Sequence, residues 1–267
     1  MNWLLITVCF VTDLLLLSLI VLKLNIARKS VVFLISLISL FSALFVNVLK
    51  ISLFEPAWFQ LSLCSIVVVF ALFGMVLLFR FYRDPEREII EKENVILSPA
   101  DGIVRYVKKI ESGSIIFPEK KGRTFPLTEI THTDYITKGS WLVGIEMSIM
   151  DVHVNRAPIS GKIEIVHRKQ GKFLSLRKIE SVMENERVTT LFVGEKFSVG
   201  VVQIASRLVR RIKVYKETGS QVARGERFGR ITFGSQVDVI VPLIENIKVR
   251  VNPGQYVKAG ETIIAEF

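Results

Sequence analysis

The sequence predicts a protein of two parts: N-terminal transmembrane helices, followed by a mostly-β soluble domain with few short helices. Three observations support this prediction: the distribution of charge, three long apolar stretches, and a later series of short alternating runs. The 267 residues are 50% hydrophobic, and their mean hydropathy is +0.44. Of the 35 basic and 25 acidic side chains, only seven lie in residues 1–82. This uneven distribution excludes a uniform soluble domain, a disordered chain and a disulfide-rich module.

Residues 1–82 form the predicted membrane domain, with three transmembrane helices at about 2–22, 30–49 and 57–79. Each stretch is long enough to cross the hydrocarbon core, which takes about 20 residues. The second and third contain no charged residue, whereas the first contains Asp13. A carboxylate at mid-membrane costs about 2.5–3.5 kcal/mol on insertion scales, so we expect Asp13 to face the other two helices.

Basic residues set the predicted topology. They lie in the loop after the first stretch and directly after the third stretch, so the positive-inside rule places residues 83–267 in the cytoplasm. The predicted location is the cell (inner) membrane, with the soluble domain on its cytoplasmic side. The net charge is +10 with both signs interspersed, and we expect a membrane rather than a nucleic acid as partner. Cys9 and Cys64 lie in apolar stretches, so no metal site is expected.

Residues 83–267 read as short strands separated by turns. The runs alternate with a period of two and turn signals recur every 8–15 residues, which is typical of a β-sandwich or a barrel-sandwich-like fold. We expect a short helix at 86–93 and a long hairpin or loop at 111–140. The alternating runs begin at Gly102, Trp141, Lys162, Thr189, Val199, Arg211, Val237 and Ile247.

Two pairs of turns have matching sequences, which suggests an internal repeat. The first pair is Gly219-Ser-Gln-Val-Ala-Arg-Gly-Glu and Asn252-Pro-Gly-Gln-Tyr-Val-Lys-Ala-Gly-Glu. The second pair is Ser98-Pro-Ala-Asp-Gly and Ala157-Pro-Ile-Ser-Gly. They predict a pseudo-symmetric sheet of the lipoyl/biotinyl carrier kind.

Candidate catalytic residues are few. The chain contains three histidines, and it contains no His-Glu-x-x-His, Walker or Gly-x-Ser-x-Gly motif. His153 lies among polar residues at the end of a predicted strand, followed by Ala-Pro and a Gly turn. Asp101 lies in an Asp-Gly pair, which ordinary turn chemistry also explains.

Several segments together resemble one enzyme family. In order along the chain they are Phe81-Tyr-Arg-Asp-Pro-Glu-Arg, Ser98-Pro-Ala-Asp-Gly, Asp151-Val-His-Val-Asn-Arg-Ala-Pro and Arg227-Phe-Gly-Arg-Ile-Thr-Phe-Gly-Ser-Gln-Val-Asp. In these segments the chain resembles phosphatidylserine decarboxylase, a membrane-bound, self-cleaving, pyruvoyl-dependent enzyme. The resemblance is closest to the short form, which has a bare Gly-Ser processing site. Of four Gly-Ser dipeptides, the resemblance selects Gly234-Ser235.

The resemblance implies an autocatalytic cleavage. Ser235 would attack the carbonyl of Gly234, with His153 as the base and Asp101 orienting it. The products would be a β chain of residues 1–234 and an α chain of residues 235–267 that stay paired. Ser235 would become the covalent pyruvoyl cofactor, the electron sink for converting phosphatidylserine to phosphatidylethanolamine and CO2. His153 would also act as the general acid of that second reaction.

The chain departs from the longer form of the family at one place. Longer-form relatives carry a second histidine three residues after the first, where this chain has Arg156. A fixed cation cannot shuttle protons, but it can hold the serine carboxylate or the phosphate of the lipid. Arg156 is therefore a candidate substrate contact.

Two alternatives stay open at this point. One is an archaetidylserine-type decarboxylase acting on ether lipids, which has the same serine headgroup in its substrate. The other is a non-enzymatic, lipoyl/biotinyl-like membrane adaptor. A homodimer is a further open partner, because the sequence does not define the oligomeric state.

Overall fold

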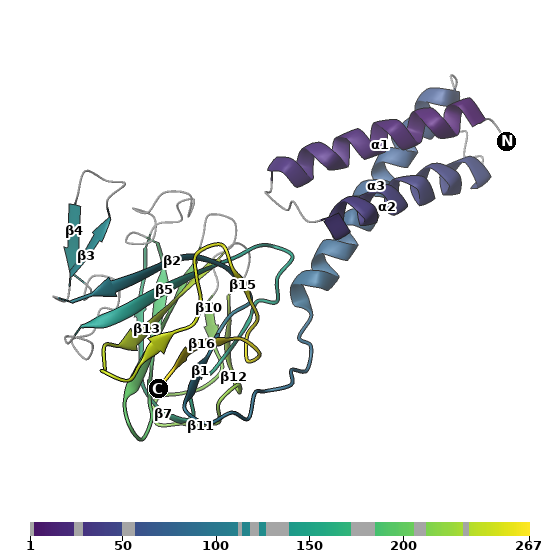
Figure 1. The fold of residues 1–267 in the computed structure, drawn as a ribbon. Coiled ribbons are helices and arrows are strands. Elements are labelled where there is room, and N and C mark those ends of the chain that lie inside the picture. Colours follow the sequence, from purple (N-terminus) through teal and green to yellow (C-terminus); the bar gives the residue numbers. More distant parts are fainter. Residues whose placement is uncertain are drawn as a thin grey trace. The chain divides into compact units, whose positions relative to one another are not determined.

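The computed structural model divides into two compact units, Met1–Tyr82 and Arg83–Phe267 (Figure 1). It describes residues 3–23, 29–49, 57–111, 114–117, 123–126, 139–171, 185–205, 212–231 and 235–267. The division lies at the boundary that the change in charge density predicts.

The first unit consists of three helices, α1 (Trp3–Lys23), α2 (Lys29–Leu49) and α3 (Ala57–Tyr82). Their positions agree with the three predicted stretches. Within the described part of the chain, the segment Cys64–Tyr82 of α3 is long and apolar enough to cross a membrane. The apolar segments found in α1 and α2 are shorter. The crossing of the membrane by these two helices therefore stays a prediction.

Asp13 lies inside this helical unit. Its side chain is fully buried, and the Ser65 hydroxyl of α3 donates a hydrogen bond to its carboxylate. The Ser42 hydroxyl of α2 in turn donates to the Ser65 carbonyl at 2.7 Å. The prediction that Asp13 faces the other helices is therefore confirmed. These polar contacts link all three helices.

The second unit is built almost entirely from strands. Its largest sheet has eight strands in the order β11-β7-β8-β9-β13-β5-β2-β15, and two three-stranded sheets have the orders β1-β16-β14 and β10-β12-β6. A separate hairpin, β3–β4, falls in the predicted hairpin or loop at 111–140. The bounds are β1 (Val95–Leu97), β2 (Gly102–Ile110), β3 (Ser114–Phe117), β4 (Arg123–Pro126), β5 (Ser140–Met147), β6 (Val154–Arg156), β7 (Gly161–Lys169), β8 (Arg187–Val193), β9 (Ser198–Ala205), β10 (Ile212–Val214), β11 (Gln221–Val222), β12 (Arg227–Ile231), β13 (Ser235–Pro242), β14 (Lys248–Val249), β15 (Tyr256–Val257) and β16 (Ile263–Glu266).

These strands form two copies of one seven-stranded motif. Repeat A contains β1, β2, β5 and β13–β16, and repeat B contains β6–β12. The two three-stranded sheets correspond strand for strand, and so do the two halves of the large sheet. Register confirms the match, because Tyr256↔Ile103 in repeat A has Gln221↔Lys162 as its counterpart in repeat B. The pair Val239↔Val201 lies on the pseudo-twofold axis. The predicted pseudo-symmetric sheet is confirmed.

Repeat B is inserted into repeat A. Strands β8 and β9 of repeat B are joined by a tight turn, in which the Gly194 N–H donates to the Phe197 carbonyl at 3.0 Å. Their counterparts in repeat A are β5 and β13, which pair in the same way but are separated in the chain by the whole of repeat B. Strand β13 therefore begins where the chain returns from the inserted repeat, and its first residue is Ser235.

Two glycines fix equivalent close approaches in the two repeats. A Cβ on Gly102 would lie 2.3 Å from the Glu146 carbonyl oxygen, and a Cβ on Gly161 would lie 2.2 Å from the Val193 carbonyl oxygen. Each glycine ends one of the matching turns and begins a strand. The second pair of similar sequences therefore reflects a shared steric requirement.

The segment that leads into the β unit corrects one expectation. Residues 83–92 form no helix, so the short helix predicted at 86–93 is wrong. Their charged side chains bond across to the sheets instead of along a helix: Arg227 bonds both Asp84 and Glu86, and Arg87 bonds Asp101 and Glu261. The Ile89 side chain packs against Gly225 and Gly260, the glycines of the matching turns. A Cβ on either glycine would collide with it.

Replacement of Gly102 or Gly161 by alanine should destabilise the β unit by similar amounts, because each Cβ meets a backbone oxygen. Overpacking of this kind costs about 1–3 kcal/mol, which lowers the Tm by roughly 3–9 °C in a domain of this size. Thermal unfolding of the detergent-solubilised protein measures the effect. Gly219→Ala is the control, because no heavy atom lies within 4 Å of its Cβ and only its positive φ is strained. A wild-type Tm for Gly102→Ala would contradict the assigned close approach.

Candidate active site

Backbone pairing brings His153 to the predicted processing site. His153 lies in the connection from β5 to β6, and its carbonyl accepts the Ile231 N–H at 3.1 Å at the end of β12. At the other end of the same connection, Met147 pairs with Ser235. Residues 232–234, including Gly234, lie outside the described residues. The described residues on both sides of them nevertheless lie beside the segment 147–154.

The His153 imidazole is fully buried, and its tautomer follows from its partner. Its Nδ1 lies 2.9 Å from the Asp151 carbonyl oxygen, which can only accept a hydrogen bond. Nδ1 therefore carries the proton, and Nε2 carries the lone pair of the neutral ring. Burial lowers the pKa of His153 to about 4, with Arg230 and Arg83 acting in the same direction. A neutral imidazole whose Nε2 carries the lone pair is a competent general base at neutral pH.

Asp151 holds the loop that carries His153. One carboxylate oxygen accepts the Ser148 N–H at 2.7 Å, and the other accepts the Tyr256 hydroxyl at 2.9 Å. The carbonyl that binds the imidazole belongs to this fixed residue. Our sequence analysis missed Asp151, although it begins the Asp-Val-His segment and an aspartate in a turn often caps a nearby N–H.

Asp101 lies in the same region but bonds other groups. Its carboxylate accepts hydrogen bonds from the Ala259 N–H and from the Arg87 guanidinium, both at 2.8 Å. Burial raises the pKa of Asp101, and these two donors oppose the rise. The His153 Nδ1–H is bonded by the Asp151 carbonyl and not by Asp101. The predicted role of Asp101 in orienting His153 therefore stays a prediction. In this structure Asp101 bonds the turn at Ala259.

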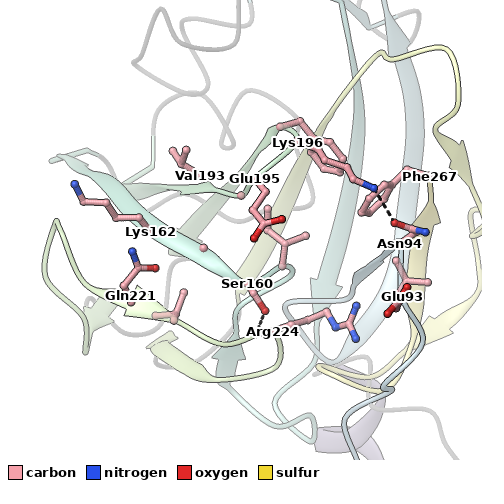
Figure 2. A pocket seen from close by; sticks show the side chains of 16 residues that line it. Glu93, Asn94, Ser160, Lys162, Val193, Glu195, Lys196, Gln221, Arg224 and Phe267 are labelled. Carbon is pink, nitrogen blue, oxygen red and sulfur yellow. Dashed lines mark hydrogen bonds between the residues drawn. The ribbon is translucent and has the colours of Figure 1, made fainter.

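A cavity of about 760 Å³ lies at strand ends of repeat B, where both ends of repeat A also line it, and none of the predicted site residues lines it (Figure 2). Its walls come from the ends of β7, β8 and β11, together with Asn94 and Phe267. Strand register identifies the counterpart of each wall residue in the other repeat. Ser160 corresponds to Asp101, because each directly precedes the close-approach glycine and each accepts an N–H from the matching turn.

The same comparison places the other two predicted residues. Asn94 corresponds to His153, since its carbonyl accepts the Phe267 N–H at 3.0 Å as that of His153 accepts the Ile231 N–H. Phe197 corresponds to Ser235. The pair Ser198↔Val193 in repeat B is equivalent to the pair Gln236↔Glu146 in repeat A, and Phe197 and Ser235 each lie one residue before it. Asp101 and Ser235 of repeat A and His153 at the start of repeat B are thus the counterparts of Ser160, Phe197 and Asn94, three residues that line one cavity.

Arg156 lies apart from this set. Its counterpart is Leu97, which does not line the cavity. The Arg156 side chain is 5% exposed, and its guanidinium donates to the Gly225 carbonyl at 2.9 Å and to the Pro85 carbonyl at 3.1 Å. These contacts attach the segment after α3 to a turn of repeat B. They account for a buried cation at this position without a substrate.

Comparison with known proteins identifies the family. The family profile described as phosphatidylserine decarboxylase matches residues 75–265. The chain belongs to the phosphatidylserine decarboxylase family. It is therefore a decarboxylase made as a proenzyme, which confirms the enzyme class predicted from the sequence and excludes the adaptor alternative.

The similarity to individual relatives covers most of the length of each relative. An archaeal protein from Methanocaldococcus jannaschii, provisionally named an archaetidylserine decarboxylase proenzyme, is 40% identical over 78% of this chain and 94% of its own. A protein with the same provisional name from Methanothermobacter thermautotrophicus is 37% identical over 80% of this chain and 94% of its own. The phosphatidylserine decarboxylase proenzyme of Chlorobium limicola is 35% identical over 75% of this chain and 84% of its own.

His153 should titrate near pH 4 rather than near its ordinary value of about 6.5, because burial and two cations disfavour the imidazolium. The measurement is histidine-selective 15N NMR of the Ser235→Ala precursor in detergent, with His153→Ala to assign its signals among the three histidines. The same spectra report the tautomer, which should be Nδ1–H. Titration near pH 6.5, or an Nε2–H tautomer, would contradict the assigned environment.

Arg156→Lys should lower the Tm of the protein by a few degrees and leave the KM for lipid unchanged. A lysine cannot donate to the Gly225 and Pro85 carbonyls with the forked geometry of a guanidinium, and a lost hydrogen bond to a buried group costs about 1–3 kcal/mol. Thermal unfolding and steady-state kinetics measure the two effects separately. A raised KM at an unchanged Tm would show that Arg156 contacts substrate.

Proposed function

We propose that this protein is a membrane-bound phospholipid decarboxylase that makes its own pyruvoyl group by cleaving the bond between Gly234 and Ser235. The observation that carries the proposal is the position of His153. It is a buried, neutral imidazole with Nδ1 protonated, and it lies in the segment that contacts both sides of residues 232–234.

The first reaction is self-cleavage. The Nε2 of His153 takes the proton from the Ser235 hydroxyl, and the serine oxygen attacks the Gly234 carbonyl, so that the amide becomes an ester. Elimination then breaks the ester C–O bond and leaves Gly234 with a free carboxylate. Addition of water to residue 235 and loss of ammonia complete the formation of the pyruvoyl group. Asp101 is proposed to support the base, as the resemblance implies.

The described residues around position 235 fit such a group. Backbone pairing to Met147 on one side and Ala205 on the other holds residue 235, and neither pairing uses the bond to Gly234. Both neighbours are buried and apolar, so they exclude water. When present, a pyruvoyl group supplies a carbonyl that accepts the electron pair released as CO2 leaves the substrate. His153 is proposed to deliver the proton that replaces CO2.

The α chain, residues 235–267, would remain bound after cleavage. Strand β13 pairs with β5 over eight residues and with β9 over six. Side chains add contacts between the two chains: the Tyr106 hydroxyl donates to Asp238 at 2.9 Å, and Arg87 bonds Glu261 at 3.0 Å. Asp238 is fully buried, and burial raises its pKa to about 6. A segment this short cannot bury a core of its own, so the pairing is what keeps it folded.

We propose phosphatidylserine or its ether-linked counterpart as the substrate. The support is the names of the relatives, which include both kinds of lipid, and the apolar helix α3, which is suited to a membrane. The reacting serine headgroup is the same in both lipids, so the site residues named above serve either one. The positive-inside rule supports a catalytic unit on the cytoplasmic side of the cell membrane.

The intact mass of the purified protein under denaturing conditions tests the proposal. The wild type should give two chains divided at 234/235, and the smaller chain should lack an amino terminus, because the pyruvoyl group replaces it. Ser235→Ala should give one intact chain, because alanine offers no nucleophile. Ser220→Ala is the matched control at another Gly-Ser pair and should cleave normally.

Decarboxylation is followed as CO2 released from phosphatidylserine in mixed micelles. His153→Ala should abolish cleavage. A wild-type protein that is folded and decarboxylates lipid as one intact chain would overturn the self-cleavage mechanism. A division after Gly219 would keep the chemistry and move the site.

A further inference from the structure

Two exposed apolar side chains lie side by side at the edge of the proposed active site. Among the described residues of the β unit, large hydrophobic side chains are exposed at only five positions, and Ile103 (43% exposed) and Tyr256 (37% exposed) are two of them. They are direct cross-strand partners on β2 and β15. Side chains of such partners share one face of the sheet.

This pair lies next to the groups that carry the chemistry. Ile103 is two residues from Asp101, separated from it by the close-approach glycine. The Tyr256 hydroxyl donates to the Asp151 carboxylate at 2.9 Å, and the Asp151 carbonyl binds the His153 imidazole. Tyr256 therefore contacts Asp151 directly, and only Asp151 separates it from the His153 imidazole.

The fold does not require apolar residues here. The same cross-strand pair in repeat B consists of Lys162 and Gln221, which are both exposed and which both line the cavity there (Figure 2). The backbone register is the same in the two repeats, so the position accepts a cation and an amide without loss of the sheet. Stability of the sheet therefore does not explain why this pair is apolar in repeat A, and a functional reason is needed.

We propose that Ile103 and Tyr256 form an apolar contact at the mouth of the active site for the hydrocarbon of the lipid substrate next to its glycerol. This inference rests on the proposed function. With the serine headgroup at His153 and residue 235, the glycerol end of the molecule reaches the rim of the site, where the first methylene groups meet this pair. Ester and ether lipids both carry these methylene groups, so the contact serves either substrate.

The test exchanges residues between the repeats. Ile103→Lys introduces the residue that repeat B carries at the equivalent position, and Lys162→Ile is the reciprocal control. The full chain in mixed micelles is assayed with long-chain phosphatidylserine and with glycerophosphoserine, which has the headgroup and glycerol but no hydrocarbon. Intact mass confirms self-cleavage of each variant.

We expect Ile103→Lys to lower the ratio of kcat/KM for phosphatidylserine to kcat/KM for glycerophosphoserine about tenfold, through a higher KM for the lipid. Loss of roughly half of the transfer free energy of an isoleucine side chain corresponds to such a factor. Ile103→Thr keeps the β-branch and should lower the ratio about threefold. Lys162→Ile should leave the ratio unchanged.

An unchanged ratio in cleaved Ile103→Lys and Ile103→Thr would overturn the apolar contact and leave the proposed function intact. An equal loss for both substrates would do the same, because it would place Ile103 in the chemistry rather than in hydrocarbon binding. A wild type that neither cleaves nor releases CO2 would instead overturn the proposed function, and this inference with it.

Discussion

The pairing of β13 along both of its edges is the interaction on which the rest of the β unit depends. This strand joins the two halves of the eight-stranded sheet, and its contact with β9 contains the pseudo-twofold axis at Val239↔Val201. It also begins at Ser235, the residue expected to become the cofactor. A bond at the start of a strand can break while the pairing of Gln236–Pro242 is kept. The central position of β13 therefore reconciles a broken chain with an intact sheet.

The duplication explains why the site is where it is. The cavity and the proposed active site lie at equivalent strand ends, but their residues differ. The cavity has Asn94, Ser160 and Phe197 where the proposed active site has His153, Asp101 and Ser235. Asparagine and phenylalanine can act neither as a base nor as a nucleophile, so the cavity does not share the chemistry of the proposed active site, to which repeat B contributes His153. The insertion of repeat B between β5 and β13 also supplies the junction at which cleavage is proposed.

Much of this architecture could be predicted from the sequence, for identifiable reasons. The long strands such as β2, β5, β9 and β13 alternate over enough residues to show a period of two. Strands β11 and β15 have two residues each, which is too short for any periodicity, and only the matching turns indicated them. The helix expected at 86–93 failed because its charges bond Arg227 and Glu266 across the fold. Sequence spacing cannot distinguish such contacts from pairs along a helix.

In the sequence, a structural role and a catalytic role predict the same residue types at Arg156 and Asp101. The contacts in the structure are needed to distinguish the two roles. A buried arginine near a histidine fits a substrate clamp as well as it fits two backbone carbonyls. The family pattern likewise indicated Asp101 as the partner of His153, but the imidazole bonds the Asp151 carbonyl, and a carbonyl has no side-chain signature. Backbone acceptors of this kind are invisible to residue patterns and appear only in the fold.

The environment of His153 suits the first proposed reaction better than the second. A pKa of about 4 makes the imidazole a base at neutral pH, but a poor holder of the proton that must later replace CO2. Burial and the cations Arg230 and Arg83 cause the low value. A bound lipid brings a carboxylate and a phosphate, and nearby negative charge raises the pKa of an imidazole. The substrate itself would therefore shift His153 toward the protonated form, so that one residue serves as base in the precursor and as acid once lipid is bound.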